Sequence, residues 1–142
     1  MVSALYSREI LRLATSIDRP RSLASPGASA EKRSPTCGSR VRVDVSLDPD
    51  GRVRELAIDV SACALGQASA ALMSAHAVGR TATELGAARD ALRRWLGNPG
   101  APGDDGFWPG IGVFGPARGY PARHPSILLA FEAVADAAER AK

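Results

Sequence analysis

Pro35-Thr36-Cys37-Gly38-Ser39-Arg40-Val41 and, further along, Ser61-Ala62-Cys63-Ala64-Leu65 are the two stretches around which the chain is organised. They hold its only two cysteines. The first thiol stands just before an alternating, strand-like segment, and the second stands just before a helical pattern. Two thiols in such positions can form half of a metal or cluster site. Spacing alone favours the plainer interpretation, which is two unrelated buried thiols.

The composition is that of one globular domain spanning residues 1–142. Its hydrophobic content of 45% and charged content of 23% are ordinary for a soluble protein. Two cysteines are too few for a disulfide scaffold, which indicates a reducing compartment. Because there is neither a signal-peptide pattern nor a run approaching the ~20 apolar residues of a membrane span, we expect a cytoplasmic protein with no membrane partner. The net charge of +3 comes from scattered arginines, so we also expect no nucleic-acid partner.

Hydrophobic periodicity predicts a helix first and then a small antiparallel sheet. Residues 4–17 carry a helical face that Ser3 or Ser7 can cap, and a loop follows over 18–30. Strict alternation over 41–47, a Pro/Gly turn and a return strand over 53–60 predict a hairpin. The apolar phase slips within the return strand, which predicts a bulge near Arg54–Glu55. A short third strand is expected over 30–35.

The second half of the chain is predicted to be mostly helical. One helix is expected over 64–78, ended by Gly79, and a capping box at 81–84 opens another that runs to about Leu96. A Gly/Pro-rich loop insertion follows over 97–119. The last helix is expected to begin near 121–125 and to run to the C-terminus. The predicted fold class is α+β, with two or three antiparallel strands and helices packed on one face of the sheet.

Taken together, these segments resemble the U-type iron–sulfur scaffold family, which includes IscU, SufU and the NifU N-terminal domain. The resemblance rests on the Cys-Gly segment at 37–38 and the Cys-Ala helix start at 63–64. It is supported by the Leu-Asp-Pro-Asp-Gly turn at 47–51 and by the segments at 120–123 and 126–131. The insertion at 97–119 makes the chain look closer to the SufU branch. The resemblance implies a SufE/NifU-like fold.

By that resemblance, the first two ligands of the family fall on Cys37 and Cys63. The family usually has an aspartate where this chain has Ser39, and a third cysteine where it has Ser126, two residues after His124. A hydroxyl is a poor ligand for soft iron sites, so the two serines do not simply replace the lost ligands. Three ways to complete the ligand set stay open: His124 as a third ligand, a cluster shared by two chains, or a thiol from glutathione or a partner protein.

The function that the resemblance implies is that of an iron–sulfur cluster assembly scaffold or carrier rather than an enzyme with its own turnover. Cys37 and Cys63 would bind iron or a labile cluster, and Cys37 would accept persulfide sulfur. The expected partners are a cysteine desulfurase and apo iron–sulfur proteins, together with a second copy of the chain if the cluster is shared. Two alternatives remain: a zinc-bound sulfur-relay protein like SufU, and a metal-free binding or regulatory module that retains the fold.

Overall fold

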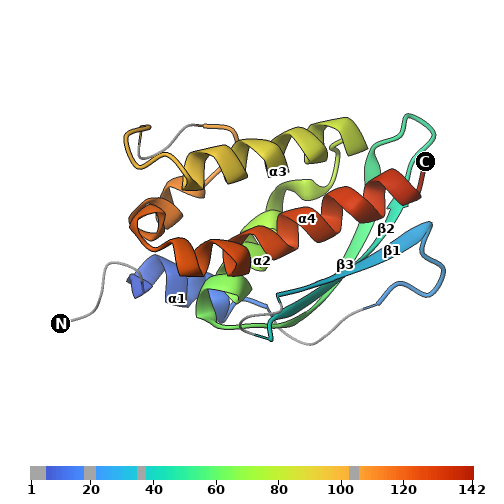
Figure 1. The fold of residues 1–142 in the computed structure, drawn as a ribbon. Coiled ribbons are helices and arrows are strands. Elements are labelled where there is room, and N and C mark those ends of the chain that lie inside the picture. The colour runs from blue at the N-terminus through green and yellow to red at the C-terminus, as the bar shows by residue number, and fades with distance from the viewer. Residues whose placement is uncertain (1–5, 18–21, 35–37, 103–105) are drawn as a thin grey trace.

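The computed structural model describes residues 6–17, 22–34, 38–102 and 106–142 (Figure 1). Within these residues, a short helix is followed by three strands and then by a run of helices, in the predicted order. The elements are α1 (Arg8–Ala14), β1 (Ala28–Arg33), β2 (Arg40–Leu47), β3 (Val53–Ser61), α2 (Ala64–Ala77), α3 (Ala82–Leu96), the 3-10 helices η2 (Ile111–Gly119) and η3 (Pro121–Arg123), and α4 (His124–Arg140).

The strands form one antiparallel sheet in the order β1-β2-β3. The hairpin turn between β2 and β3 is closed by a hydrogen bond from Gly51 N to Asp48 O (2.9 Å), and Gly51 has the positive φ of 80° that the turn needs. Ser46 pairs with Glu55 while Leu47 pairs with Val53, so Arg54 is an extra residue in β3. The predicted hairpin and the bulge are both confirmed.

The third strand is present, but it begins earlier than the sequence predicted. β1 covers Ala28–Arg33 instead of 30–35, so the loop expected to reach residue 30 ends three residues sooner, at residue 27. Gly27 N already donates to Val45 O (2.8 Å), which aligns the chain with β2 before the first alternating residue. Tertiary pairing, not local propensity, therefore sets this boundary.

Helices cover a single face of the sheet (Figure 1). Val41, Val43 and Val45 alternate along β2 and are fully buried on that face. Ile127 and Phe131 of α4 are buried in the same core. The α+β prediction is thus confirmed. None of the described helices is long and apolar enough to cross a membrane.

The helix ends follow the capping chemistry of the sequence, although α1 is shorter than predicted. Ser7 caps α1 by accepting from Ile10 N, and the capping box between Thr81 and Glu84 is complete. α1 stops at Ala14, before residue 17, because the Thr15 and Ser16 hydroxyls donate back to carbonyls of its last turn. Ser3 and the start of the predicted helix lie outside the described residues.

The segment expected as a Gly/Pro-rich loop over 97–119 is ordered over its described second half. Residues 111–119 form η2, and Trp108, Ile111 and Phe114 are buried in the main core. Trp108 Nε1 donates to Leu72 O (3.1 Å), and Arg118 donates to Ala101 O (2.6 Å). The high Gly and Pro content indicated a loop, but residues 111–119 form a 3-10 helix that packs on the core. The prediction gave too little weight to the three large apolar residues of the segment.

Asp44 is a buried carboxylate that joins β2 to the segment before β1. It is 1% exposed and accepts hydrogen bonds from Ser29 Oγ (2.7 Å), Leu23 N (3.0 Å) and Arg42 Nε (3.2 Å). Burial opposes the ionised form, but these hydrogen bonds and the Arg42 charge outweigh it, so the pKa of Asp44 lies below its ordinary value. The carboxylate is therefore charged, and its hydrogen bonds connect β2 to the segment before β1.

We expect Asp44→Asn to lower the free energy of unfolding at neutral pH by about 1–3 kcal/mol, because the amide NH₂ cannot accept these bonds. The native carboxylate stabilises the fold above the ordinary aspartate pKa of 3.8, and this contribution is lost as the pH falls through the depressed folded value. Urea midpoints at decreasing pH test this, with Asp50→Asn in the exposed turn as the control. A gap between native and Asp44→Asn proteins that stays constant into acid would contradict it.

Candidate functional site

A hollow of about 260 Å³ opens where three distant segments meet at one end of the sheet. The first segment precedes β2, the second joins β3 to α2, and the third passes from η3 into α4. Eight residues line it: Gly38, Ser39, Ser61, Ala62, Cys63, Ala122, Arg123 and Ser126. The predicted site residues Ser39, Cys63 and Ser126 are thus brought together. Cys37 lies outside the described residues, next to Gly38 in the sequence.

Cys63 stands at the junction of β3 and α2 and is partly exposed. It is the N-cap residue of α2, with extended φ and ψ of −66° and 173°, and its side chain makes no capping hydrogen bond. A helix N-terminus presents unpaired N–H groups and a partial positive charge. This end of α2 therefore favours negative charge close to the Cys63 sulfur.

Two backbone hydrogen bonds join Ser34 to the residues just before β2. Gly38 N donates to Ser34 O (3.0 Å) and Ser34 N donates to Ser39 O (2.9 Å). Gly38 has a φ of +71°, a conformation that residues with a Cβ rarely adopt. Ser39 is 3% exposed and is one of the residues that line the hollow.

The third wall is held by close packing between α2 and α4. Ser69 Oγ donates to Ile127 O, and a Cβ at Gly66 would lie 2.7 Å from Ala62 Cβ and 3.4 Å from Ser126 O. Glycine at 66 thus leaves room for the Ala62 side chain just before α2. Ser126, 3% exposed, lines the same hollow as Cys63.

Arg123 is the one charged residue among those that line the hollow. It is exposed, and none of the described residues forms an ion pair with it. Arg40 is also close to Cys37 in the sequence, but its guanidinium is held by Asp59 (3.3 Å) and Glu31 (3.4 Å). The hydrogen bond to Asp59 is the main reason that the pKa of Arg40 is raised. The sequence feature that could have indicated Arg123 as a site residue is its place in the Tyr-Pro-Ala-Arg segment at 120–123.

His124 is the first residue of α4, but it does not line the hollow. Its Nε2 lies 3.0 Å from Ala117 O, a hydrogen bond in which the ring nitrogen is the donor. To act as a metal ligand, this nitrogen would have to leave that bond, or the ring would have to offer Nδ1. The ligand role of His124 stays a prediction.

The donor chemistry of the hollow does not fit a resident zinc ion. Its described walls supply one thiol and three hydroxyls, with no carboxylate or imidazole. Throughout the described parts of the chain, no three His, Cys, Asp or Glu residues are grouped so as to hold a metal ion. A structural zinc site needs four ligands of this kind, and Cys37 adds at most one to the Cys63 thiol.

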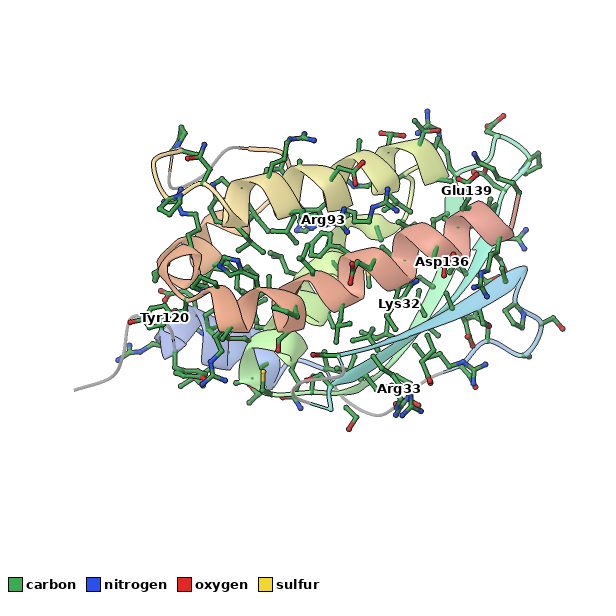
Figure 2. The ribbon with its side chains drawn as sticks, viewed as in Figure 1. Lys32, Arg33, Arg93, Tyr120, Asp136 and Glu139 are labelled. Carbon is green, nitrogen blue, oxygen red and sulfur yellow. The ribbon has the colours of Figure 1, made fainter. Side chains whose placement is uncertain are left out.

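A larger groove of about 690 Å³ lies between α3, α4 and β1. Its charged side chains pair with one another, as in Arg93–Glu132 (3.1 Å) and Lys32–Asp136 (3.4 Å). It contains no thiol or imidazole, so it offers no ligands for soft metals. Figure 2 shows four residues of this groove: Lys32, Arg93, Asp136 and Glu139.

Solved structures reveal what the chain is similar to. The crystal structure of the N-terminal part of a nitrogen-fixing NifU-like protein from Brucella abortus matches with 43% identity and a TM-score of 0.88, over 97% of this chain and 94% of that one. The chain belongs to the NifU-like family of U-type scaffolds. A scan of family models finds no match, and neither does a search of curated proteins.

Two more distant structures share the fold of this NifU-like chain. One is a putative iron–sulfur cluster assembly scaffold protein for the SUF system from Fervidobacterium islandicum AW-1, with 20% identity, a TM-score of 0.82 and coverage of 94% and 96%. The other is a hypothetical protein with 18% identity, a TM-score of 0.81 and coverage of 97% and 99%. Identities this low show the fold alone, so the assignment to the SufU branch stays a prediction.

Proposed function

We propose that this NifU-like chain is a scaffold or carrier for iron–sulfur cluster assembly that holds its cargo through Cys37 and Cys63. The observation that carries the proposal is the hollow itself. It gathers Cys63, Ser39 and Ser126, which are positions where the family resemblance places ligands, and Gly38 next to Cys37 lines it too. Family membership supports the same conclusion, since a relative 43% identical over nearly the whole chain is NifU-like.

In the proposed reaction, sulfur reaches the chain from a cysteine desulfurase. The thiolate of Cys37 attacks the outer sulfur of the donor persulfide, so a new S–S bond forms at Cys37 and the donor leaves as a thiolate. No net oxidation occurs in this transfer. Conversion of the bound sulfur to sulfide takes two electrons per atom, which a separate reductant supplies. The negative charge that develops is stabilised by Arg123 and by the N-terminus of α2.

Iron is the cargo that best suits the thiols, because thiolates are the usual ligands of iron–sulfur clusters. The loaded chain would then pass its cargo to apo iron–sulfur proteins. Such a carrier fits the cytoplasm, where thiols stay reduced. In this proposal the chain binds, orients and protects the cargo, and the transfer chemistry belongs to its partners.

Sulfur acceptance is tested by incubating the protein with a cysteine desulfurase and cysteine, then measuring the intact mass without reductant. We expect the native chain to gain one sulfur atom on Cys37, and Cys37→Ala to lose nearly all of this gain. Cys63→Ser is the matched control, which keeps Cys37 and should still accept sulfur. An equal gain in the native and Cys37→Ala chains would remove Cys37 from the transfer step.

Two alternative functions are a zinc-bound sulfur relay and a metal-free binding module. Metal analysis and melting curves with and without chelator distinguish them. A sulfur relay of the zinc-bound kind predicts one zinc per chain and a fall in melting temperature on chelation, because a metal bound to the native state stabilises it. A metal-free module predicts that neither the metal content nor the melting temperature depends on either cysteine. The donor set of the hollow speaks against the zinc relay.

A further inference from the structure

The end of the molecule that holds α1 exposes apolar side chains to solvent. Among the described residues, the exposed large hydrophobic side chains are Leu11, Val78 and Tyr120. Leu11, which is 45% exposed, belongs to α1, and Tyr120, which is 50% exposed, is the C-cap of η2. α1 and η2 contact each other, and Figure 2 shows Tyr120 beside α1. Two of these three side chains thus lie at the same end of the fold.

Exposed arginines accompany these two apolar side chains. Arg8, Leu11 and Arg12 follow the i, i+3, i+4 spacing of one helix face, and all three are exposed. A single 3-10 turn joins Tyr120 to Arg123, because Arg123 N donates to Tyr120 O (2.9 Å). Arg123 is also part of the lining of the hollow. We call these five residues the α1 patch: Arg8, Leu11, Arg12, Tyr120 and Arg123.

The three arginines of the α1 patch have no ion-pair partner in the parts of the chain that the structure describes. Other arginines do have one, as in Arg33–Glu31 (3.0 Å) on β1. Glu9 is the nearest carboxylate in the sequence, but it lies about 160° from Leu11 around the axis of α1. The α1 patch therefore presents positive charge that no described carboxylate of the chain neutralises.

Within the chain itself, these charges oppose the helix that carries them. Arg8 is the first residue of α1, where the helix dipole disfavours a cation. Arg12 follows at i+4, a spacing at which like charges repel each other. A carboxylate bound across Arg8 and Arg12 would remove both unfavourable interactions. The arrangement therefore favours an anionic partner on this face of α1.

We propose that the α1 patch binds an acidic protein segment that carries an apolar side chain between carboxylates. The carboxylates pair with the arginines of the α1 patch, and the apolar side chain packs on Leu11 and Tyr120. Because Arg123 belongs to both the patch and the hollow, a protein bound in this way lies next to the hollow. The inference goes beyond the proposed function, since it involves neither cysteine.

A protein segment fits the α1 patch better than a membrane surface or a nucleic acid does. A helix that binds a membrane surface buries a broad apolar face among the lipids, whereas Leu11 is the large apolar side chain that α1 exposes. Single-stranded nucleic acid needs several aromatic side chains on which successive bases stack, and Tyr120 is the aromatic residue of this patch. Isolated apolar contacts flanked by arginines match carboxylates that flank an apolar residue.

The test titrates the unloaded chain into a fluorescein-labelled Glu-Glu-Leu-Glu-Glu-Leu-Glu-Glu peptide and follows the fluorescence anisotropy. We expect binding at low salt that weakens as salt screens the charges, and no binding of the same peptide with Gln in place of Glu. Arg8→Glu should weaken binding at least several-fold while α1 stays folded, because an acidic residue is favourable at a helix N-terminus. Arg94→Glu on the exposed side of α3 is the matched control and should bind like the native chain.

Tyr120→Ala tests the apolar half of the α1 patch and should also weaken binding, with Val78→Ala as its control. Equal affinities of the native and Arg8→Glu chains for the glutamate peptide would overturn the inference, as would no binding by the native chain. Binding to phosphatidylserine vesicles without binding to the peptide would assign the patch to a membrane instead. The Cys37→Ala/Cys63→Ala chain should bind the peptide normally, so failure of this inference and failure of the proposed function are distinguishable.

Discussion

Cys63→Ser is expected to abolish cluster loading while the fold stays as stable as before, or becomes more stable. Serine is nearly the same size as cysteine but is a poor ligand for soft iron, so the hollow keeps its shape and loses the sulfur of Cys63. Cys63 is the N-cap of α2 without a side-chain capping bond. Serine is a preferred N-cap residue, worth roughly 1 kcal/mol over a residue that cannot cap.

The loss of loading is measured as the iron and sulfide bound after anaerobic loading. The stability of the fold is measured separately with a urea unfolding curve. Loading should fall at least tenfold while the unfolding midpoint stays equal or rises. Ser61→Ala at the rim of the same hollow is the control and should load normally. A Cys63→Ser protein that loads as well as the native chain would show that the thiol in the hollow does not hold the cargo.

Trp108→Ala is expected to produce the largest loss of stability. Trp108 is fully buried, donates to Leu72 O and packs edge-on against Phe131, with ring centroids 5.1 Å apart. Arg80 Cζ lies over the Trp108 ring, 4.1 Å from its centroid. Truncating a buried aromatic residue to alanine lowers stability by about 3–5 kcal/mol, which is a large part of the ~5–15 kcal/mol of a typical domain.

Denaturant unfolding followed by far-UV circular dichroism measures this loss. Phe107→Ala, beside Trp108 but only partly buried, serves as the control and should have a smaller effect. A loss below about 1 kcal/mol for Trp108→Ala would mean that residues 106–119 do not dock on the core as described.

The sequence predicted most of the fold because its local signals agree with the tertiary structure. The period-two alternation over β2, the Gly51 turn and the Thr81–Glu84 capping box each have one plain physical reading, and each is confirmed. Boundaries were less predictable. β1 begins at Ala28 because its first residues pair with β2, although their own propensity indicates a loop.

The site was predictable in its residue types and less so in its geometry. The flanking residues led to Cys63, Ser39 and Ser126, which the structure brings together in one hollow. The role of Arg123 was missed, since no local pattern shows which arginine of a scattered set lacks a carboxylate partner. That Arg40 pairs with Asp59 depends on strand register across β2 and β3, and this pairing appears only once the sheet has formed.

The central claim is that the two thiols of this NifU-like chain carry a transferable cluster. Its most direct test is to load the native chain with iron and sulfide, remove unbound ions, add an apo-ferredoxin and follow the appearance of the holo-ferredoxin spectrum. We predict equal amounts of iron and sulfide on the native chain and their transfer to the ferredoxin, with neither from the Cys37→Ala/Cys63→Ala double variant. Equal binding and transfer by the native chain and the double variant would contradict the claim.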